Sequence, residues 1–276
     1  MALPSGWLGQ ADNFLGIDEP WCHPDQAGVY VLPAPYEHTS SYILGSDRGP
    51  SAIIEASQQV ELYDETLRYE PYREWGGVAT AATLNLDGRV DGPAVQAIQD
   101  FVQPHVGRGK FLVTLTGEHT GALGAIRAHA RNYPGMCVVQ IDAHGDLRQA
   151  YQDNPYSHAS VMARVVEDGL PLVQIGVRSI SPEEIDLIQK TPRIHTFFAA
   201  SILDPSGPYE GRAARWIPEV LAACTGPVYL TFDCDGLDAS LVPALGTPEP
   251  GGLGWYDTLA LVTALANGPG IVGMDI

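Results

Sequence analysis

The chain has 276 residues, of which 45% are hydrophobic and 17% are charged, so it can bury a core and is not a disordered chain. Acidic residues outnumber basic residues by 33 to 15, and the formal net charge is −18 at pH 7. This charge disfavours nucleic acid as a partner, because the phosphate backbone is itself anionic. It favours a cationic partner, either a metal ion or a basic small molecule.

Cysteine usage and the N-terminal residues bear on where the protein works. The four cysteines, Cys22, Cys137, Cys224 and Cys234, form no CxxC pair, which favours free thiols in a reducing compartment. The first residues have neither the basic start nor the apolar stretch of a signal peptide, and no run of about 18 apolar residues occurs. We therefore expect a cytoplasmic protein that has no membrane partner.

Along the chain, an N-terminal extension over residues 1–27 precedes an alternation of short apolar runs and amphipathic stretches. The runs are rich in β-branched residues and predict strands at 28–32, 80–86, 111–115, 136–142, 172–177, 194–198, 228–233 and 271–276. The amphipathic stretches predict helices at 49–57, 94–106, 121–132, 158–169, 182–190, 212–224 and 255–267. This alternation predicts one α/β domain over 1–276, with helices on both faces of a mostly parallel sheet.

Three of the predicted strands end in acidic and imidazole side chains. Glu118 and His119 follow the strand at 111–115, and two further clusters follow the strands at 136–142 and 228–233. Those clusters contain Asp142, His144 and Asp146, and Asp233 and Asp235. In an open α/β sheet, ligands bind beyond the carboxyl ends of the strands. If the chain stays extended there, alternate residues share one face, so these side chains are expected to converge.

Four carboxylates in one small volume repel each other unless cations neutralise them. A site that is rich in oxygen, with two imidazoles and no thiolate, suits Mn²⁺, and other first-row metals remain possible. Six ligands are too many for one catalytic metal with an open position, and they favour a pair of ions. Cys234 lies between two acids and is expected to point into the core. The remaining histidines are interpreted as structural: His23, His38, His105, His129 and His195.

Taken together, GEHT, DAHGD and DCDGLDASLVPALGTPEPGGL resemble the ureohydrolases, the family of arginase, agmatinase and guanidinobutyrase. The resemblance extends from about residue 28 to the end of the sequence. It implies a three-layer α/β/α fold whose parallel sheet has about eight strands, which agrees with the eight strands predicted above. It also implies a homo-oligomer, a trimer or a hexamer, and two Mn²⁺ ions per subunit.

The resemblance assigns a role to each candidate residue. His119, Asp142, Asp146 and Asp233 would hold one ion; His144, Asp142, Asp233 and Asp235 would hold the other, with Asp142 and Asp233 bridging. A metal-bridged hydroxide would attack the guanidinium carbon of the substrate and release urea. His158, in NPYSHAS, matches the histidine that serves the family as a proton shuttle, a role suited to an imidazole.

The substrate implied by the resemblance is a small cationic guanidino compound, with agmatine, hydrolysed to putrescine and urea, favoured. Arginases carry a Ser-Gly-Asn segment before the matching histidine, whereas residues 154–157 here read NPYS. Guanidinobutyrate and other guanidino acids remain alternatives. Family members also continue past the equivalent of Ile276 with a substrate-binding glutamate, and we expect such a continuation beyond this sequence.

Three other classes of protein are alternatives to a ureohydrolase. A metal-dependent deacetylase on the related fold generally uses one zinc or iron ion, and the complete set of acids argues against it. A binuclear phosphoesterase usually presents an Asn-His pair after a strand, which is absent here. A catalytically silent metal-binding homologue is the remaining alternative.

Overall fold

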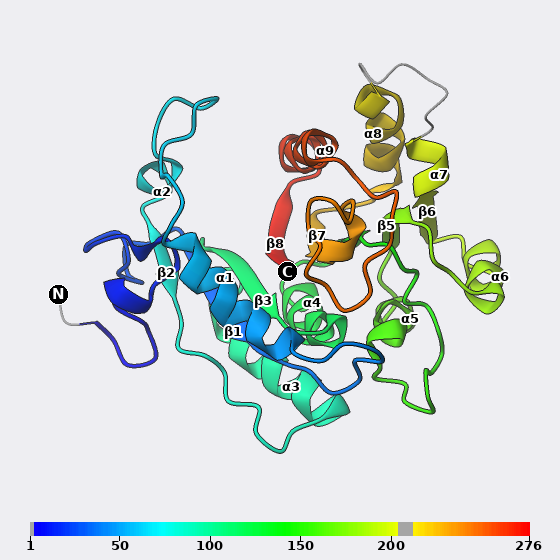
Figure 1. Ribbon diagram of the computed structural model, residues 1–276, viewed down its shortest axis with the longest axis horizontal. Coiled ribbons are helices and arrows are strands. Elements are labelled where there is room, and N and C mark those ends of the chain that lie inside the picture. Colours follow the sequence, from blue (N-terminus) through cyan, green and yellow to red (C-terminus); the bar gives the residue numbers. More distant parts are fainter. Residues whose placement is uncertain (1–2, 204–211) are drawn as a thin grey trace.

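The computed structural model describes residues 3–203 and 212–276 and contains one eight-stranded sheet (Figure 1). The strands lie in the order β2-β1-β3-β8-β7-β4-β5-β6, and all neighbouring pairs are parallel. Their bounds are β1 Val29–Ala34, β2 Val78–Thr80, β3 Phe111–Thr116, β4 Cys137–Ile141, β5 Leu172–Val177, β6 Ile194–Phe198, β7 Val228–Phe232 and β8 Ile271–Asp275.

Helices cover both faces of this sheet (Figure 1). On one face, α3, α4 and α5 pack in a single core cluster; on the other, α1 covers β1 and β3 while α7, α8 and α9 cover β7, β4 and β5. The bounds are α1 Gly49–Ser57, α2 Pro71–Glu74, α3 Asp91–Val102, α4 Ala122–Ala130, α5 Val161–Glu167, α6 Pro182–Lys190, α7 Ala199–Ile202, α8 Arg212–Ala223 and α9 Trp255–Asn267. The predicted α/β/α arrangement is confirmed.

The β4 strand shows why continuous apolar runs form this sheet. All five of its residues are buried. Val138 contacts the core beneath α3 to α5, whereas Cys137, Val139 and Ile141 contact the core on the other face. Neighbouring side chains of a strand point to opposite faces of the sheet. A strand that is covered by helices on both sides therefore has no face in contact with water, and most of its residues are apolar.

The second strand differs from its predicted position. We expected residues 80–86, but β2 covers Val78–Thr80 and ends where that run begins. The Ala81 amide still donates to the Val31 carbonyl of β1 at 2.9 Å, and Ala81 also forms an isolated antiparallel bridge with Trp7 of the N-terminal segment. The Trp7 ring in turn packs on Tyr30 of β1, with ring centroids 4.4 Å apart. Pro33 of β1 has no amide proton to continue the ladder, so the strand ends there.

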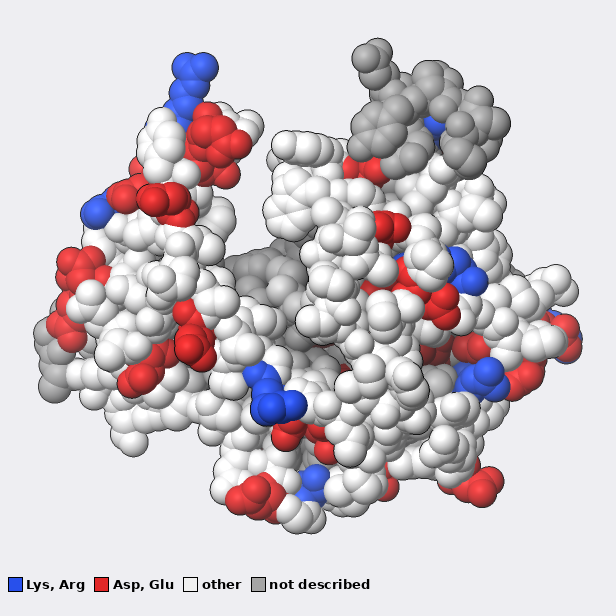
Figure 2. All heavy atoms as spheres, viewed as in Figure 1, with Lys and Arg blue, Asp and Glu red and all other residues white. Residues whose placement is uncertain are grey.

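Three further properties concern the whole molecule. Acidic groups outnumber basic groups on the face seen in Figure 2, in line with the composition of the chain. In the described part of the chain, every helix is too short or too polar to cross a bilayer. All four cysteines are free, as expected.

Candidate metal centre

The predicted site residues come together at the carboxyl edge of the sheet. His119 begins a short 3-10 turn, η5 (His119–Gly121), just after β3. Asp142, His144 and Asp146 follow β4, and Asp233 and Asp235 follow β7. The strands β4 and β7 are neighbours, and β8 alone separates β7 from β3. The parallel topology therefore brings these three loops side by side.

One group of ligand atoms forms around His119. Its Nδ1 atom lies 3.0 Å from Asp142 Oδ2 and 2.9 Å from Asp146 Oδ2, and 3.7 Å from Asp233 Oδ2. The side chains of His119, Asp142 and Asp146 are all buried, whereas the Asp233 side chain is 28% exposed to solvent. Three carboxylates thus face one imidazole nitrogen.

A second group forms around His144. Its Nδ1 atom lies 3.0 Å from Asp235 Oδ2 and 3.5 Å from Asp142 Oδ1. Asp142 belongs to both groups, with one carboxylate oxygen turned to each imidazole. Two adjacent positions, each lined by one imidazole and at least two carboxylates, therefore share the Asp142 side chain.

The local backbone corrects our expectation that extended chain brings these residues together. β4 ends at Ile141 and β7 at Phe232, so the acids lie in turns beyond the strands. Asp233 precedes a 3-10 turn, η7 (Cys234–Gly236), and its side chain accepts a hydrogen bond from the Asp235 amide at 2.9 Å. Asp146 has a φ of +50°, in the left-handed region. Tight turns, and not strand alternation, aim the carboxylates inward.

Cys234 lies in that turn between the two acids. It is half-buried and belongs to neither group of ligand atoms. Burial, together with the charges of Asp233 and Asp235, raises the pKa of its thiol to about 12, so the group stays protonated. Cys234 belongs to none of the three core clusters of the described residues, so the expectation that it points into the core is not confirmed.

A second shell of hydrogen bonds fixes the His119 ring. Thr231 Oγ1 donates to Asp275 Oδ2 at 2.9 Å and lies 2.9 Å from His119 Nε2. Because the hydroxyl has one proton and gives it to Asp275, His119 Nε2 must be the donor in its contact with Thr231. The lone pair of His119 then lies on Nδ1, which faces the carboxylates. On the β4 side, Gln140 Nε2 donates to Asp142 Oδ2 at 2.7 Å.

The ionisable groups of the cluster perturb each other strongly. Burial alone would raise the pKa of Asp142, but the neighbouring His119 and His144 imidazoles outweigh it and lower that pKa. Burial and the charge of Asp142 raise the pKa of Asp146 to about 6, and burial with the charges of Asp235 and Asp142 raises that of Asp233. Crowded carboxylates thus hold protons that isolated ones would lose.

The imidazoles respond in the opposite sense. Burial would lower the pKa of His144, but its contacts with Asp142 and Asp235 raise it to about 11. The same pattern raises the pKa of His119, through Asp142 and Asp146. In the absence of a metal ion, the protons held by these imidazole and carboxyl groups balance part of the negative charge of the cluster.

The geometry fits metal ions. His119 Nδ1 is buried and lacks a hydrogen bond of acceptable geometry, although two carboxylate oxygens lie within 3.0 Å of it. Adjacent ligands of an octahedral cation at about 2.1 Å lie about 3 Å apart. The spacing of these atoms and the oxygen-rich donor set therefore suit hard or borderline divalent metals.

His158 lies beside this cluster. It begins the 3-10 turn η6 (His158–Ser160), which packs against η5, the turn that carries His119. Its ring lies edge-on to Tyr151 with centroids 5.8 Å apart, and its Nδ1 atom is 3.1 Å from Thr39 Oγ1. The loop that follows Asp146 is tied to the same turn, because the Arg148 amide donates to the Ala159 carbonyl at 3.1 Å.

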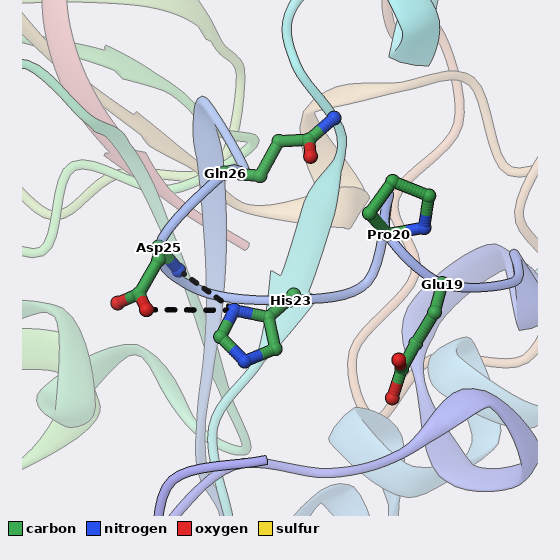
Figure 3. Close-up of a pocket in the computed structure, with 5 residues that line it drawn as sticks. All are labelled: Glu19, Pro20, His23, Asp25 and Gln26. Carbon is green, nitrogen blue, oxygen red and sulfur yellow. Dashed lines mark hydrogen bonds and ion pairs between the residues drawn. The ribbon is translucent and has the colours of Figure 1, made fainter. Parts of the chain in front are cut away.

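A separate pocket of about 220 Å³ lies in the N-terminal segment and is lined by Glu19, Pro20, His23, Asp25 and Gln26 (Figure 3). His23 Nδ1 accepts a hydrogen bond from the Asp25 amide at 3.3 Å. These residues lead into the start of β1, so the pocket lies at the amino edge of the sheet, away from the metal cluster. This position keeps His23 away from the candidate metal centre.

Four residues support the site in ways that were not predicted from the sequence: Thr39, Glu118 as a structural partner, Thr231 and Asp275. Asp275 ends β8, and the strand-end rule that identified Asp142 and Asp233 would have identified it. The threonines carry no comparable signal, because a hydroxyl at these positions is common in any strand or loop.

Comparison with known proteins agrees with this geometry. The Arginase family matches residues 27–276 of the chain. An N(1)-aminopropylagmatine ureohydrolase of Synechocystis sp. is 41% identical over 282 residues, covering all of this chain and 89% of the relative. An agmatinase of Bacillus anthracis is 30% identical and covers 92% of this chain and 84% of the relative.

Among solved structures, the agmatine ureohydrolase of Thermoplasma volcanium superimposes with a TM-score of 0.76 at 28% identity. It covers 91% of this chain, and the match covers 81% of the solved chain. The resemblance inferred from GEHT, DAHGD and DCDGLD is confirmed, since the match extends through all three motifs. By its sequence along nearly its whole length and by its fold, this chain belongs to the arginase family.

Proposed function

We propose that this protein is an amidinohydrolase that uses two Mn²⁺ ions to release urea from a guanidino amine. The observation that carries the proposal is the pair of imidazole-carboxylate groups that share Asp142. We assign His119, Asp142, Asp146 and Asp233 to one ion and His144, Asp142, Asp233 and Asp235 to the other. When bound, such a pair of cations supplies Lewis-acid activation of water at neutral pH.

The protein's own residues supply the remaining chemistry. A guanidinium carbon is a poor electrophile, and the amine leaves only after it gains a proton. We assign that proton transfer to His158, because its Nδ1 atom is held by Thr39 and its other nitrogen is left to exchange protons. The acidic character of the chain attracts a substrate with more than one positive charge.

Within this class, we propose N(1)-aminopropylagmatine as the main substrate and agmatine as the second candidate. The 41% identity to the Synechocystis enzyme over the whole chain supports the first. The agmatinase of Bacillus anthracis and the agmatine ureohydrolase of Thermoplasma volcanium support the second. The amine left after loss of urea is in either case a polyamine, which places the reaction in polyamine synthesis.

The test is a urea-release assay of the Mn²⁺-loaded protein with N(1)-aminopropylagmatine, agmatine, arginine, guanidinobutyrate and guanidine. We expect the highest kcat/KM with N(1)-aminopropylagmatine and a lower value with agmatine. Urea from guanidinobutyrate alone would contradict the substrate assignment. No urea from any compound, with two metal ions bound per chain, would contradict the enzyme class and favour a silent homologue.

The assay extends to the proposed proton-transfer residue. His158→Ala is expected to lower kcat by about 10² to 10⁴-fold while the bound metal stays at the wild-type level. Loss of the metal in this variant would instead assign His158 a structural role at the cluster.

A further inference from the structure

A continuous line of hydrogen bonds joins Glu118 to His158 through Thr39. Thr39 Oγ1 donates to Glu118 Oε1 at 2.7 Å and lies 3.1 Å from His158 Nδ1. The three residues come from three separate loops: the one after β1, the turn between β3 and η5, and the start of η6. The contact between Thr39 and His158 spans 119 residues of sequence, so the fold alone brings them together.

The Glu118 carboxylate takes part in this line of hydrogen bonds and not in the metal cluster. Its buried carboxylate accepts from the amides of His38 at 2.8 Å and Thr39 at 2.6 Å and from the Thr39 hydroxyl at 2.7 Å. The Thr120 hydroxyl lies 2.9 Å from Glu118 Oε1 and 3.1 Å from the Tyr156 carbonyl, and its single proton can go to only one of them. At least three of the roughly four lone-pair positions of the carboxylate are therefore taken. Glu118 belongs to neither group of candidate metal ligands in the described residues.

Counting protons at Thr39 fixes the state of the His158 ring. The hydroxyl has one proton, which it gives to Glu118, and two lone pairs left to accept. One lone pair accepts the His158 backbone amide at 3.0 Å, and the other faces His158 Nδ1 at 3.1 Å. Nδ1 must therefore carry a proton, and the neutral imidazole keeps its free lone pair on Nε2.

A competing partner for Nδ1 is too weak to change this assignment. Ser157 Oγ lies 3.5 Å from His158 Nδ1, beyond the usual range of a hydrogen bond. Tyr151 packs against the edge of the ring and limits its rotation.

We propose that Thr39 and Glu118 are positioning residues that hold His158 in the Nδ1-protonated tautomer, with Nε2 free to accept and return a proton. This inference rests on the proposed proton-transfer role of His158. The arrangement resembles the carboxylate that orients histidine in Ser-His-Asp triads, except that a threonine hydroxyl stands between the two groups.

Thr39→Val tests the proposal, because valine has the shape of threonine and lacks the hydroxyl. We expect kcat for urea release to fall about 10- to 100-fold, with KM within twofold of wild type and two metal ions still bound. Thr39→Ser restores a hydroxyl and is expected to restore kcat to within a few-fold. An equal kcat in the valine variant and wild type would overturn the proposal, as would an equal loss in the serine and valine variants.

A measurement on the unmodified protein tests the same point without activity. In protein loaded with diamagnetic Zn²⁺, nitrogen NMR of labelled histidine reports which ring nitrogen of His158 carries the proton, with His158→Asn used to assign the signal. We expect Nδ1–H in wild type and Thr39→Ser, and loss of that preference in Thr39→Val. Nε2–H in wild type would overturn the proposal even if every variant were inactive or unstable.

These two readouts separate the inference from the proposed function. If wild type releases no urea from any guanidino compound, the proposed function fails, and the tautomer of His158 still decides the hydrogen-bonded line. If wild type releases urea and Thr39→Val does so equally well, the proposed function stands and the positioning role fails.

Discussion

Two threonine hydroxyls in this protein each join a buried carboxylate to an imidazole. Thr231 lies between Asp275 and His119, and Thr39 lies between Glu118 and His158. In each case the single hydroxyl proton goes to the carboxylate, so the imidazole must donate and its other nitrogen is left with a lone pair. That lone pair faces the carboxylate cluster in His119 and is left for proton exchange in His158.

At the residue scale, Thr231→Val is expected to weaken Mn²⁺ affinity about 10- to 100-fold, because His119 loses the partner that fixes its tautomer and orientation. Thr231→Ser keeps the hydroxyl and is expected to bind nearly as tightly as wild type. Equilibrium dialysis with metal analysis measures the effect. Thr39→Val serves as the matched control, since it removes a hydroxyl of the same kind that does not contact His119. Equal affinity in wild type and Thr231→Val would contradict the assigned role.

At the scale of secondary-structure elements, α4 packs unusually close to β8. A side chain at Gly273 of β8 would place its Cβ 2.2 Å from His129 Nε2, so this strand position requires glycine. His129 is fully buried, donates Nδ1 to the Ala125 carbonyl at 2.8 Å and packs on the Tyr229 ring. His129 therefore supports the helix layer beneath the metal site, in agreement with the structural role predicted for it.

Burial lowers the pKa of His129 to about 4, and this gives a pH dependence to stability. In the unfolded state the His129 imidazole becomes protonated below about pH 6.5, whereas in the folded state it becomes protonated only below about pH 4. The free energy of unfolding therefore falls as pH falls from about 6.5 to about 4. At pH 5 the loss is about 2 kcal/mol relative to pH 8. Urea unfolding of the metal-free protein measures it, and His129→Gln is expected to remove that part of the pH dependence. An unchanged difference between pH 8 and pH 5 in the variant would contradict this account.

Arg178 makes a comparable connection between loops. Its guanidinium donates to the carbonyls of Asp235 at 2.6 Å, Glu249 at 2.7 Å and Pro250 at 3.0 Å. The planar group with five donors suits this task, whereas a lysine could not serve so many acceptors in fixed directions. The loop that carries Asp235 is thus anchored to the end of β5.

At the scale of the whole molecule, the candidate metal centre joins loops that follow β3, β4 and β7 and are far apart in sequence. Without cations, burial and the charges of Asp235 and Asp142 raise the pKa of Asp233. A carboxyl group whose folded-state pKa is raised costs stability as pH rises above its unfolded value near 3.9. The metal-free fold therefore loses stability at neutral pH, and we expect bound metal to restore it.

Asp233→Asn is expected to change thermal stability in opposite directions with and without metal. In the presence of chelator at pH 7.5, the variant is expected to have a higher Tm than wild type, because an asparagine avoids the cost of burying or protonating a carboxylate among other acids. With Mn²⁺ at about 100 times its Kd, wild type gains about 2.7 kcal/mol per site and the variant gains less. Thermal unfolding measures both. An equal gain from Mn²⁺ in the two proteins would exclude Asp233 as a ligand.

The expected homo-oligomer stays a prediction.

Much of the architecture could be read from local patterns. Apolar runs alternating with amphipathic stretches predicted eight strands, and the helices at 49–57, 182–190 and 255–267 were predicted to the residue. The second strand was misplaced, because Pro33 of the neighbouring strand has no amide proton to continue the pairing. The site residues were found because acids and imidazoles at strand ends are chemically distinctive, although turns and not extended chain bring them together.

The sequence by itself indicated which side chains gather at the candidate site, because periodicity and ligand type are local properties of a chain. Only the tertiary structure decided which nitrogen of His119 and of His158 is protonated. That choice depends on Thr231, Asp275, Thr39 and Glu118, whose contacts cross between separate strands and loops. A hydroxyl's single proton can be assigned only when all its neighbours are in place, and the fold places them.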